Sequence, residues 1–289
     1  MNNTSEGIYA VFGKPIGHTL SPKIHGLFAK NTGLRIDYRA IEVNNSLDDS
    51  LKKFREATPI GIGANITVPF KEQAAVISDV QHPAVRISGA ANTLWWSNIP
   101  SSNNKASMHA DNTDGIGLIK DLSRLQINIQ SENLLMYGAG GAAKGVLYEL
   151  LKLKPKKVVV VNRTHMKAQE LVEKFYPIAH ENSVELSTVD LSYLHLTKEK
   201  FKLVINATNM GLTDNLLPRI SFEVLSNDSF VYDMVYGRDT PLKQWCLENN
   251  INFADGLGML IEQAAESFYI WKGVRPKTRN VLAEIRSGL

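Results

Sequence analysis

The spacing of hydrophobic and polar positions changes repeatedly along the chain, from short apolar runs to apolar residues three or four positions apart. The clearest unit begins with a mostly apolar run at 133–137, which passes into glycines over 138–141. Apolar side chains then recur at helical spacing over 144–153, and a second apolar run at 157–161 is typical of a buried strand. The pattern predicts a strand–turn–helix–strand unit over 132–164.

The same alternation of strand and helix extends to both sides of this unit. Expected strands lie at 8–13, 37–43, 63–68, 91–96, 184–187, 203–207 and 230–236. The strand at 91–96 is expected to form a hairpin with a further strand at 107–110. Expected helices lie at 22–30, 47–57, 71–78, 114–125, 165–175, 241–249, 259–271 and 277–289. This alternation predicts an α/β fold with mainly parallel sheets.

The glycine-rich turn after the first strand of the central unit is typical of a phosphate site. A turn that joins a strand to a helix presents free backbone N–H groups at the positive end of the helix. Gly138 allows the tight turn, Gly140 lets a pyrophosphate approach the backbone, and the small Ala143 permits close contact between helix and strand. The turn therefore predicts a dinucleotide site in preference to a merely tight loop. Its candidate cofactor-binding residues are Gly138, Ala139, Gly140, Gly141 and Ala142.

The end of the second strand indicates which dinucleotide is bound. An NAD site usually places a carboxylate there to accept a hydrogen bond from the ribose 2′-hydroxyl. The residues at this point are instead Asn162, Arg163, Thr164 and Lys167, and the first acid comes at Glu170. The alternative is an ordinary solvated helix start, but two cations in a first turn oppose the helix dipole unless an anion is bound there. The sequence therefore favours NADP.

Length and composition narrow the class of protein. The 289 residues suffice for two domains with full cores, and the chain is 44% hydrophobic and 21% charged with a net charge of +3. This small and dispersed charge, without a basic run interleaved with aromatics, argues against a nucleic-acid partner. The single cysteine, Cys246, excludes an internal disulfide, and the cysteine and histidine spacing predicts no metal site. We expect a cytoplasmic protein without a membrane partner, because neither a signal-peptide pattern nor a long apolar stretch occurs.

Polar residues cluster where strands of the N-terminal part end, which is the edge at which parallel sheets bind ligands. One cluster contains Ser21, which is either an N-cap or a ligand hydroxyl, and another ends in Lys71. Lys71 lies in the first turn of a helix, where the dipole disfavours a cation. It is either a functional residue or an ordinary exposed lysine. In the last cluster Asp114 or Thr113 can cap the next helix, which leaves Asp111 unexplained. Lys71 and Asp111 therefore form a candidate acid–base pair for interconverting an alcohol and a ketone.

Seven motifs, in this order and spacing, resemble those of the shikimate dehydrogenases. They are Asn65-x-Thr67-Val68-Pro69-x-Lys71, Gly89-Ala90-x-Asn92-Thr93, Asp111-Asn112-Thr113-Asp114-Gly115, the glycine turn, Asn162-Arg163-Thr164, Asn206-Ala207-Thr208 and Ala254-Asp255-Gly256-x-Gly258-Met259-Leu260. The resemblance spans the chain from Ala10 to Gly273.

The resemblance implies two domains and a reaction. Residues 1–110 and the returning C-terminal helices, 257–289, would form the substrate domain. Residues 111–256 would form a Rossmann-like domain that binds NADP, and the active site would lie in the cleft between the two. The implied activity is the reversible, NADPH-dependent reduction of 3-dehydroshikimate to shikimate, which acts on a CH–OH group in the synthesis of aromatic amino acids.

The resemblance also assigns roles to single residues. By matching positions, Lys71 and Asp111 would be the catalytic pair. The hydroxyls and the carboxylate of the substrate would be held by Thr19, Ser21, Thr67, Asn92, Tyr236 and Gln263. Met234 and Gly256 would lie beside the nicotinamide.

Two positions depart from the family pattern in ways that bear on specificity. Thr19 stands where a serine is usual, so the hydroxyl is kept but a methyl group is added, which leaves the breadth of substrates open. Lys167 stands where many members have an arginine, so the charge is kept without the planar fork. The alternatives are a quinate/shikimate dehydrogenase with broader substrate or NAD use, an enzyme like methylene-tetrahydrofolate dehydrogenase, and a catalytically silent NADP-binding regulatory homologue. A monomer or a homodimer is expected.

Overall fold

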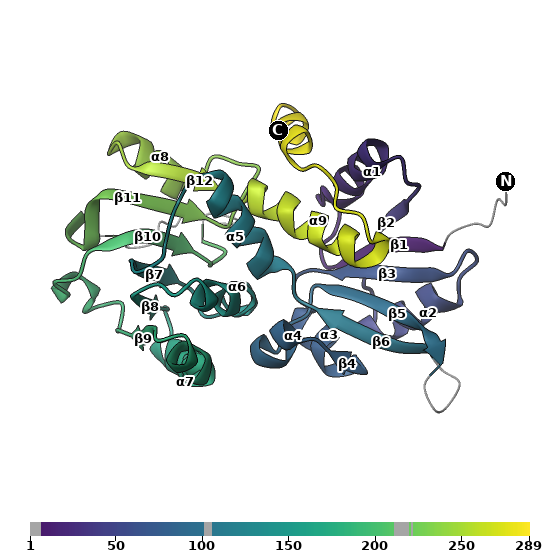
Figure 1. Ribbon diagram of the computed structural model, residues 1–289, viewed down its shortest axis with the longest axis horizontal. Coiled ribbons are helices and arrows are strands. Elements are labelled where there is room, and N and C mark those ends of the chain that lie inside the picture. The colour runs from purple at the N-terminus through teal and green to yellow at the C-terminus, as the bar shows by residue number, and fades with distance from the viewer. Residues whose placement is uncertain (1–6, 101–105, 211–219, 221) are drawn as a thin grey trace. The chain divides into compact units, whose positions relative to one another are not determined.

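The computed structural model describes the chain apart from residues 1–6, 101–105, 211–219 and 221, and it divides into two compact units (Figure 1). Unit 1 comprises Met1–Gly117 with Ile261–Gly288, and unit 2 comprises Leu118–Leu260 with Leu289. The division falls inside helices α5 (Asp114–Arg124) and α9 (Leu257–Lys272), a few residues beyond each boundary expected from the sequence.

Unit 1 is built on a six-stranded mixed sheet in the order β2-β1-β3-β5-β6-β4. Its strands are β1 (Ile8–Gly13), β2 (Asp37–Glu42), β3 (Gly61–Ile66), β4 (Val80–Gln81), β5 (Thr93–Pro100) and β6 (Ala106–Asp111). β1 is parallel to β2 and β3, whereas β5 is antiparallel to β3 and β6, which confirms the expected hairpin. Because β5 runs the opposite way, its first residue, Thr93, is level with Asn65 near the end of β3 and with Asp111 at the end of β6. The polar clusters that follow β3 and β6 and precede β5 therefore share one edge of the sheet.

Both faces of this sheet are covered by helices. The helices of unit 1 besides α5 and α9 are α1 (Ser21–Thr32), α2 (Leu47–Glu56), α3 (Lys71–Ile77), α4 (Pro83–Ser88) and α10 (Arg279–Arg286). Alternate residues of a strand point to opposite faces, so Ala10 and Phe12 join the core formed with α2, α3 and α4. Tyr9, on the other face of β1, packs on Trp271 of α9 with ring centroids 5.0 Å apart.

Unit 2 contains a six-stranded sheet in the order β12-β11-β10-β7-β8-β9, in which every pairing is parallel. Its strands are β7 (Asn133–Tyr137), β8 (Lys157–Val161), β9 (Glu185–Thr188), β10 (Phe201–Asn206), β11 (Leu225–Asp233) and β12 (Asn252–Asp255). Its helices are α6 (Gly141–Lys152), α7 (His165–Glu181), α8 (Pro241–Glu248), and the short turns η1 (Leu194–Leu196) and η2 (Phe222–Val224). Counted from β7, the order is that of the dinucleotide-binding Rossmann fold, which binds its ligand where the strand order reverses. The expected β7–α6–β8 unit and Rossmann-like fold are confirmed.

The structure differs from the predicted elements in three places. β12 was not expected, because a strand of four half-exposed or exposed residues at the sheet edge carries little apolar signal. Helix α7 continues beyond Phe175 to Glu181 although Pro177 lies inside it, so the proline that favours an earlier end is accommodated. Helix α4 and strand β4 are too short to give a periodic pattern.

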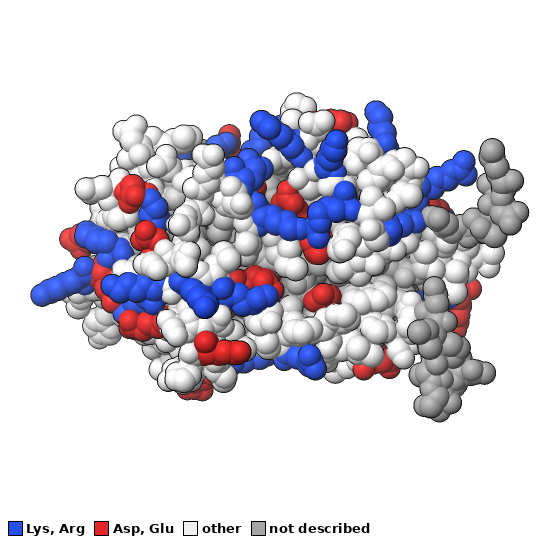
Figure 2. Space-filling view, viewed as in Figure 1, with Lys and Arg blue, Asp and Glu red and all other residues white. Residues whose placement is uncertain are grey.

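On the face shown in Figure 2, Lys and Arg lie interspersed with Asp and Glu, so neither sign of charge covers this face. Among the described residues, no helix combines the length and the apolar character that a membrane crossing requires. Within the same residues, no cluster of three or more His, Cys, Asp and Glu side chains is arranged to hold a metal ion.

Candidate active site

Lys71 and Asp114 form a largely buried ion pair at the polar edge of the unit 1 sheet. Lys71 begins α3 shortly after β3, and Asp114 begins α5 shortly after β6. Lys71 Nζ lies 2.5 Å from Asp114 Oδ2, and the two side chains are 19% and 7% exposed. Asp114 thus supplies the anion that compensates a lysine held at the unfavourable end of a helix.

Asn92 and Gln263 complete the group around this ion pair. Asn92 Nδ2 donates to Asp114 Oδ1 at 2.7 Å, so both oxygens of the carboxylate are engaged. Asn92 is 3% exposed, and its Oδ1 accepts a hydrogen bond from the Thr113 N–H at 2.9 Å. Asn92 Nδ2 also lies 3.3 Å from Gln263 Oε1 on α9. The fold therefore brings together three of the residues predicted from the sequence, Lys71, Asn92 and Gln263.

The carboxylate beside Lys71 is Asp114, and not Asp111 as the sequence predicts. Asp111 ends β6, and its Oδ1 accepts a hydrogen bond from the Asn112 N–H at 2.8 Å. Asn112 in turn accepts at Oδ1 from the Asp114 N–H at 3.0 Å in an Asx turn, while Thr113, whose carbonyl accepts from the Gly117 N–H at 2.9 Å, holds the N-cap position that the sequence assigned to Asp114 or Thr113. The Asp114 carboxylate is thereby left to contact Lys71 and Asn92. The expected pairing of Lys71 with Asp111 is corrected accordingly.

The hydroxyls of Thr19 and Ser21 lie together after β1. Thr19 Oγ1 is 3.2 Å from Ser21 Oγ, and the Ser21 N–H donates to Thr19 Oγ1 at 3.3 Å. Ser21 is the first residue of α1, and the N-cap position belongs to Leu20, so the alternative role of Ser21 as an N-cap is wrong. Thr67 follows β3, the strand beside β1, and is half-buried, with its N–H donating to the Phe12 carbonyl at 2.9 Å.

A group of hydrogen-bonded polar side chains holds Asn92 in place. Asn65 Nδ2 donates to the Asn92 carbonyl at 3.1 Å and to Ser267 Oγ at 3.0 Å, while Asn65 Oδ1 accepts from Tyr38 OH at 2.7 Å. Thr93 Oγ1 lies 2.8 Å from Ser267 Oγ. Sequence reasoning missed these supports. Ser267 lies one helical turn after Gln263, a spacing that could have indicated it, whereas no sequence signal indicates Tyr38.

His25 is buried in the same unit without a polar role. It stacks on Tyr38 with ring centroids 4.1 Å apart, and it also contacts Phe28, Phe268 and Trp271. Neither ring nitrogen has a partner of hydrogen-bonding geometry. Burial lowers the pKa of His25 from 6.5 to about 3, so the ring is neutral in the folded protein.

We expect His25 to make stability depend on pH. Between pH 6.5 and about 3 the unfolded chain binds a proton at this residue and the folded chain does not. The free energy of unfolding should therefore fall with decreasing pH by about 1.4 kcal/mol per pH unit from this group. His25→Phe keeps an apolar ring and removes the proton, so its stability should fall less steeply over this range in denaturant titrations. Equal slopes for the variant and the wild type would contradict the assignment.

In unit 2 the glycine turn forms an open backbone cradle after β7. Gly138 has φ +108°, and a Cβ there would lie 2.9 Å from the Ala207 carbonyl oxygen, so the turn needs glycine at this position. A Cβ on Gly140 or Gly141 would meet nothing within 4 Å. Gly140 caps α6 without a side-chain hydrogen bond, which leaves the first N–H groups of the helix for a ligand. Ala139 is buried and Ala142 half-buried in the same turn. This open, donor-rich cradle fits a pyrophosphate.

The end of β8 carries exposed cations beside the start of α7. Arg163, Thr164 and Lys167 are exposed, and Thr164 is the N-cap of α7 without a side-chain capping bond. Asn162 Nδ2 donates to the Thr164 carbonyl at 2.8 Å, which fixes the turn. The first turn of α7 contains no acidic residue. This donor set fits a 2′-phosphate and offers no carboxylate to a free ribose 2′-hydroxyl.

Met234, Tyr236 and Gly256 gather at the carboxyl ends of β11 and β12. The Met234 N–H donates to the Asn206 carbonyl at 3.0 Å, and the Gly256 N–H donates to the Val235 carbonyl at 3.1 Å. A Cβ on Gly256 would lie 2.3 Å from the Met234 carbonyl oxygen. Tyr236 is half-buried, and burial raises the pKa of its hydroxyl. The predicted nicotinamide-side residues thus lie on one edge of the unit 2 sheet.

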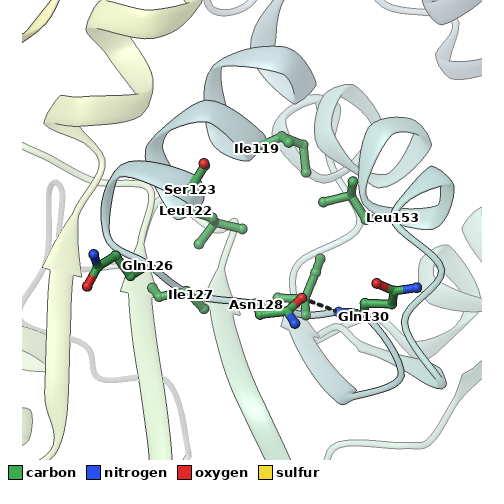
Figure 3. A pocket seen from close by; sticks show the side chains of 9 residues that line it. Ile119, Leu122, Ser123, Gln126, Ile127, Asn128, Gln130 and Leu153 are labelled. Carbon is green, nitrogen blue, oxygen red and sulfur yellow. Dashed lines mark hydrogen bonds between the residues drawn. The ribbon is translucent and has the colours of Figure 1, made fainter.

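A pocket of about 420 Å³ lies elsewhere in unit 2 (Figure 3). It is lined by Ile119, Leu122, Ser123, Gln126, Ile127, Asn128, Ile129, Gln130 and Leu153. Ile129 precedes β7 and Leu153 follows α6, so the pocket lies at the amino end of β7, whereas the glycine turn follows its carboxyl end. The predicted cofactor-binding residues do not line it.

Three family models match the chain one after another. The model described as the shikimate dehydrogenase substrate binding domain matches residues 11–94. The model described as shikimate / quinate 5-dehydrogenase matches residues 121–239. The model described as the shikimate 5′-dehydrogenase C-terminal domain matches residues 256–286.

Known proteins match the chain over nearly its whole length. A shikimate dehydrogenase (NADP(+)) from Vibrio atlanticus is 41% identical over 285 residues, which cover 97% of each chain. A protein of the same name from Legionella pneumophila is 39% identical over 285 residues, which cover 96% of this chain and 98% of the other. The crystal structure of shikimate 5-dehydrogenase from Thermus thermophilus in complex with NADP(H) and shikimate is 28% identical and has a TM-score of 0.81. It covers 98% of this chain, which covers 100% of that one.

Proposed function

The chain belongs to the shikimate dehydrogenase family, and from this membership we propose that it catalyses the reversible reduction of 3-dehydroshikimate to shikimate with NADPH. The reaction interconverts a ketone and an alcohol in the synthesis of aromatic amino acids. The observation that carries the proposal is the buried Lys71–Asp114 pair held by Asn92, since an alcohol–ketone conversion needs a proton donor and acceptor at the reacting oxygen.

Lys71 and Asp114 are the proposed acid–base pair. When bound, NADPH would supply the hydride for reduction, and NADP+ would accept it in oxidation. Lys71 holds the proton at the reacting oxygen: its ammonium donates to the ketone oxygen during reduction, and the neutral amine takes the hydroxyl proton during oxidation. Asp114 fixes the lysine 2.5 Å away, and Asn92 fixes Asp114, so the pair is oriented before substrate arrives. This arrangement replaces Asp111 by Asp114 in the catalytic role.

The proposed substrate ligands in unit 1 are Thr19, Ser21, Thr67, Asn92 and Gln263. Thr19 and Ser21 offer two adjacent hydroxyls that suit a carboxylate, and the helix start at Ser21 favours an anion. Thr67, Asn92 and Gln263 offer polar groups for the ring hydroxyls, and Tyr236 of unit 2 is the further proposed ligand. Thr19 makes activity on quinate a second candidate function. Its methyl group changes the packing around the proposed carboxylate site, and its hydroxyl is kept.

The residues proposed to hold NADP all lie in unit 2. They are Gly138, Ala139, Gly140, Gly141 and Ala142 for the pyrophosphate, Asn162, Arg163, Thr164 and Lys167 for the 2′-phosphate, and Met234 and Gly256 for the nicotinamide. The open cradle of the glycine turn and the cationic end of β8 support this choice. Lys167 binds phosphate as a point charge and not as a fork, so Arg163 carries the directional contact.

Arg163→Ala should therefore weaken binding of NADP far more than binding of NAD. A charge-assisted hydrogen bond is worth about 1.5–3 kcal/mol, so we expect the KM for NADP to rise by about tenfold or more. The KM for NAD should change little, because NAD lacks the phosphate. Initial rates against each cofactor measure both values, with the exposed Lys198→Ala as a control in the same unit. An equal change for both cofactors would show that Arg163 does not contact the 2′-phosphate.

Four rate measurements test the proposal against its alternatives. Initial rates of cofactor reduction are compared for shikimate and quinate, each with NADP and NAD. We expect shikimate with NADP to dominate. Comparable rates with quinate would favour the broader quinate/shikimate enzyme, a preference for NAD would overturn the assignment of the cofactor, and silence in all four would favour a regulatory homologue. The cytoplasmic location and the state of a monomer or a homodimer are also proposals, the latter tested by sedimentation.

A further inference from the structure

The segment between β11 and α8 carries two residues of the proposed site. Met234 and Tyr236 follow the last residue of β11, Asp233, and the segment ends at Thr240, the N-cap of α8. The segment has no regular secondary structure of its own, so the positions of both side chains depend on what holds its two ends.

The carboxylate of Asp233 joins both ends of this segment to a neighbouring strand. Asp233 is 0% exposed. Its Oδ1 accepts from Asn206 Nδ2 at 2.9 Å and from the Val235 N–H at 3.1 Å, while its Oδ2 accepts from Thr240 Oγ1 at 3.0 Å. Asn206 ends β10 and Thr240 is the N-cap of α8, so one carboxylate ties three points of the chain together.

The three contacts of Asp233 are shielded from water. Asn206 and Thr240 are 0% and 2% exposed, so water cannot replace a lost partner. Burial raises the pKa of the Asp233 carboxyl, and the Val235 N–H, the Asn206 amide and the Thr240 hydroxyl act in the opposite direction by stabilising the ionised form. Removing the Thr240 hydroxyl would take away the donor of Oδ2, whereas Oδ1 would keep one donor if either of its two partners were lost.

The opposite side of the segment is fixed by the backbone. The Met234 N–H is bound to the Asn206 carbonyl, and the Val235 carbonyl accepts from the Gly256 N–H. Gly256 lies so close to Met234 that a Cβ would approach its carbonyl oxygen to 2.3 Å. The backbone at 234–235 is therefore held on both sides, and the far end of the segment is held by the bond from Thr240 to Asp233 together with the contact of Asp239 with Lys243 on α8.

We propose that Asp233 is a positioning residue that fixes the segment 234–240 so that Met234 and Tyr236 meet the nicotinamide and the substrate. This role rests on the proposed function. Asp233 touches neither ligand in this scheme and acts through the segment that it ties. Its loss should lower turnover more than it weakens binding of the adenosine part of the cofactor, because that part is held by other residues.

The test compares kcat with the binding of a cofactor fragment. Thr240→Val keeps the shape of the side chain and removes its bond to Asp233 together with the N-cap bond from the Lys243 N–H, whereas Asp233→Ala removes all three bonds of the carboxylate and is the variant more prone to misfold. We expect Thr240→Val to lower kcat for shikimate oxidation by about tenfold or more, since small misplacements of reacting groups have large effects on rate. The affinity for adenosine 2′,5′-bisphosphate, which lacks the nicotinamide, should stay within about twofold in calorimetry.

Two variants control for a merely structural effect. Thr240→Ser keeps the hydroxyl and should restore kcat to near the wild-type value. Ser229→Ala removes another buried hydrogen bond of β11, from Ser229 Oγ to the Phe201 carbonyl at 2.6 Å, and should lower thermal stability without lowering kcat. A kcat for Thr240→Val within twofold of wild type, or a loss of kcat matched by an equal loss of fragment affinity, would overturn the positioning role. The wild-type rate is measured first: a silent wild type contradicts the proposed function itself, and an active wild type with unaffected variants contradicts only the role of Asp233.

Discussion

Lys71→Ala is expected to lower kcat for shikimate oxidation by about 10²–10⁴-fold, the range by which a positioned general acid or base contributes to catalysis. Lys71 is the cation held in the partly buried group with Asp114 and Asn92, and the proposed mechanism routes the proton through its amine. The KM for shikimate should change much less, because the proposed site for the substrate carboxylate is elsewhere, at Thr19 and Ser21.

The control for this variant is Lys52→Ala, on the exposed face of α2 in the same unit. It removes the same charge from an exposed position outside the group around Lys71 and should leave kcat unchanged. Circular dichroism and thermal melts of both variants establish that they are folded. A Lys71→Ala enzyme that is folded and retains turnover within about threefold of wild type would remove Lys71 from the mechanism.

Asp114→Asn should reduce kcat by about 10²-fold or more, whereas Asp111→Asn should leave it within about threefold. Asp114 is the carboxylate bound to Lys71, and its replacement by an amide removes the charge that orients the lysine while keeping the shape. Asp111 accepts a hydrogen bond from the Asn112 N–H at the end of β6, which the amide oxygen of an asparagine can also accept. The two variants are matched, since they lie three positions apart in one motif and make the same chemical change.

Comparing the two variants decides between Asp114, which the structure places beside Lys71, and Asp111, which the sequence alone assigns to the pair. Steady-state kcat and KM for shikimate are measured for both under the same conditions. A larger loss of kcat for Asp111→Asn than for Asp114→Asn would contradict the account and would return the catalytic role to Asp111.

Much of the fold follows from the sequence because the buried strands carry strong patterns. The apolar runs of β7 and β8, with the glycine turn between them, predict the Rossmann-like unit, and the fold confirms it. The strands expected at 91–96 and 107–110 likewise form an antiparallel pair, β5 and β6. Edge strand β12 and the end of α7 were missed, since tertiary packing sets them and local pattern does not.

The candidate site was predicted in its composition but not in its pairing. Lys71 follows from its place at a strand end, because topology brings strand ends together, whereas Asn92 follows from the family resemblance. The choice between Asp111 and Asp114 depends on which residue caps α5, and several polar residues in succession can each fill that position. Thr113 holds the N-cap position and the Asn112 side chain binds the Asp114 N–H, an arrangement that only the three-dimensional structure reveals.

The central claim is that this chain is an NADP-dependent shikimate dehydrogenase whose proton passes through Lys71. The most direct measurement is the initial rate of NADPH formation from shikimate by the wild type and by Lys71→Ala, assayed side by side at equal concentrations of folded protein. The account predicts steady turnover by the wild type and a rate lower by about 10²-fold or more in the variant. No turnover by the wild type, or equal rates for the two proteins, would contradict it.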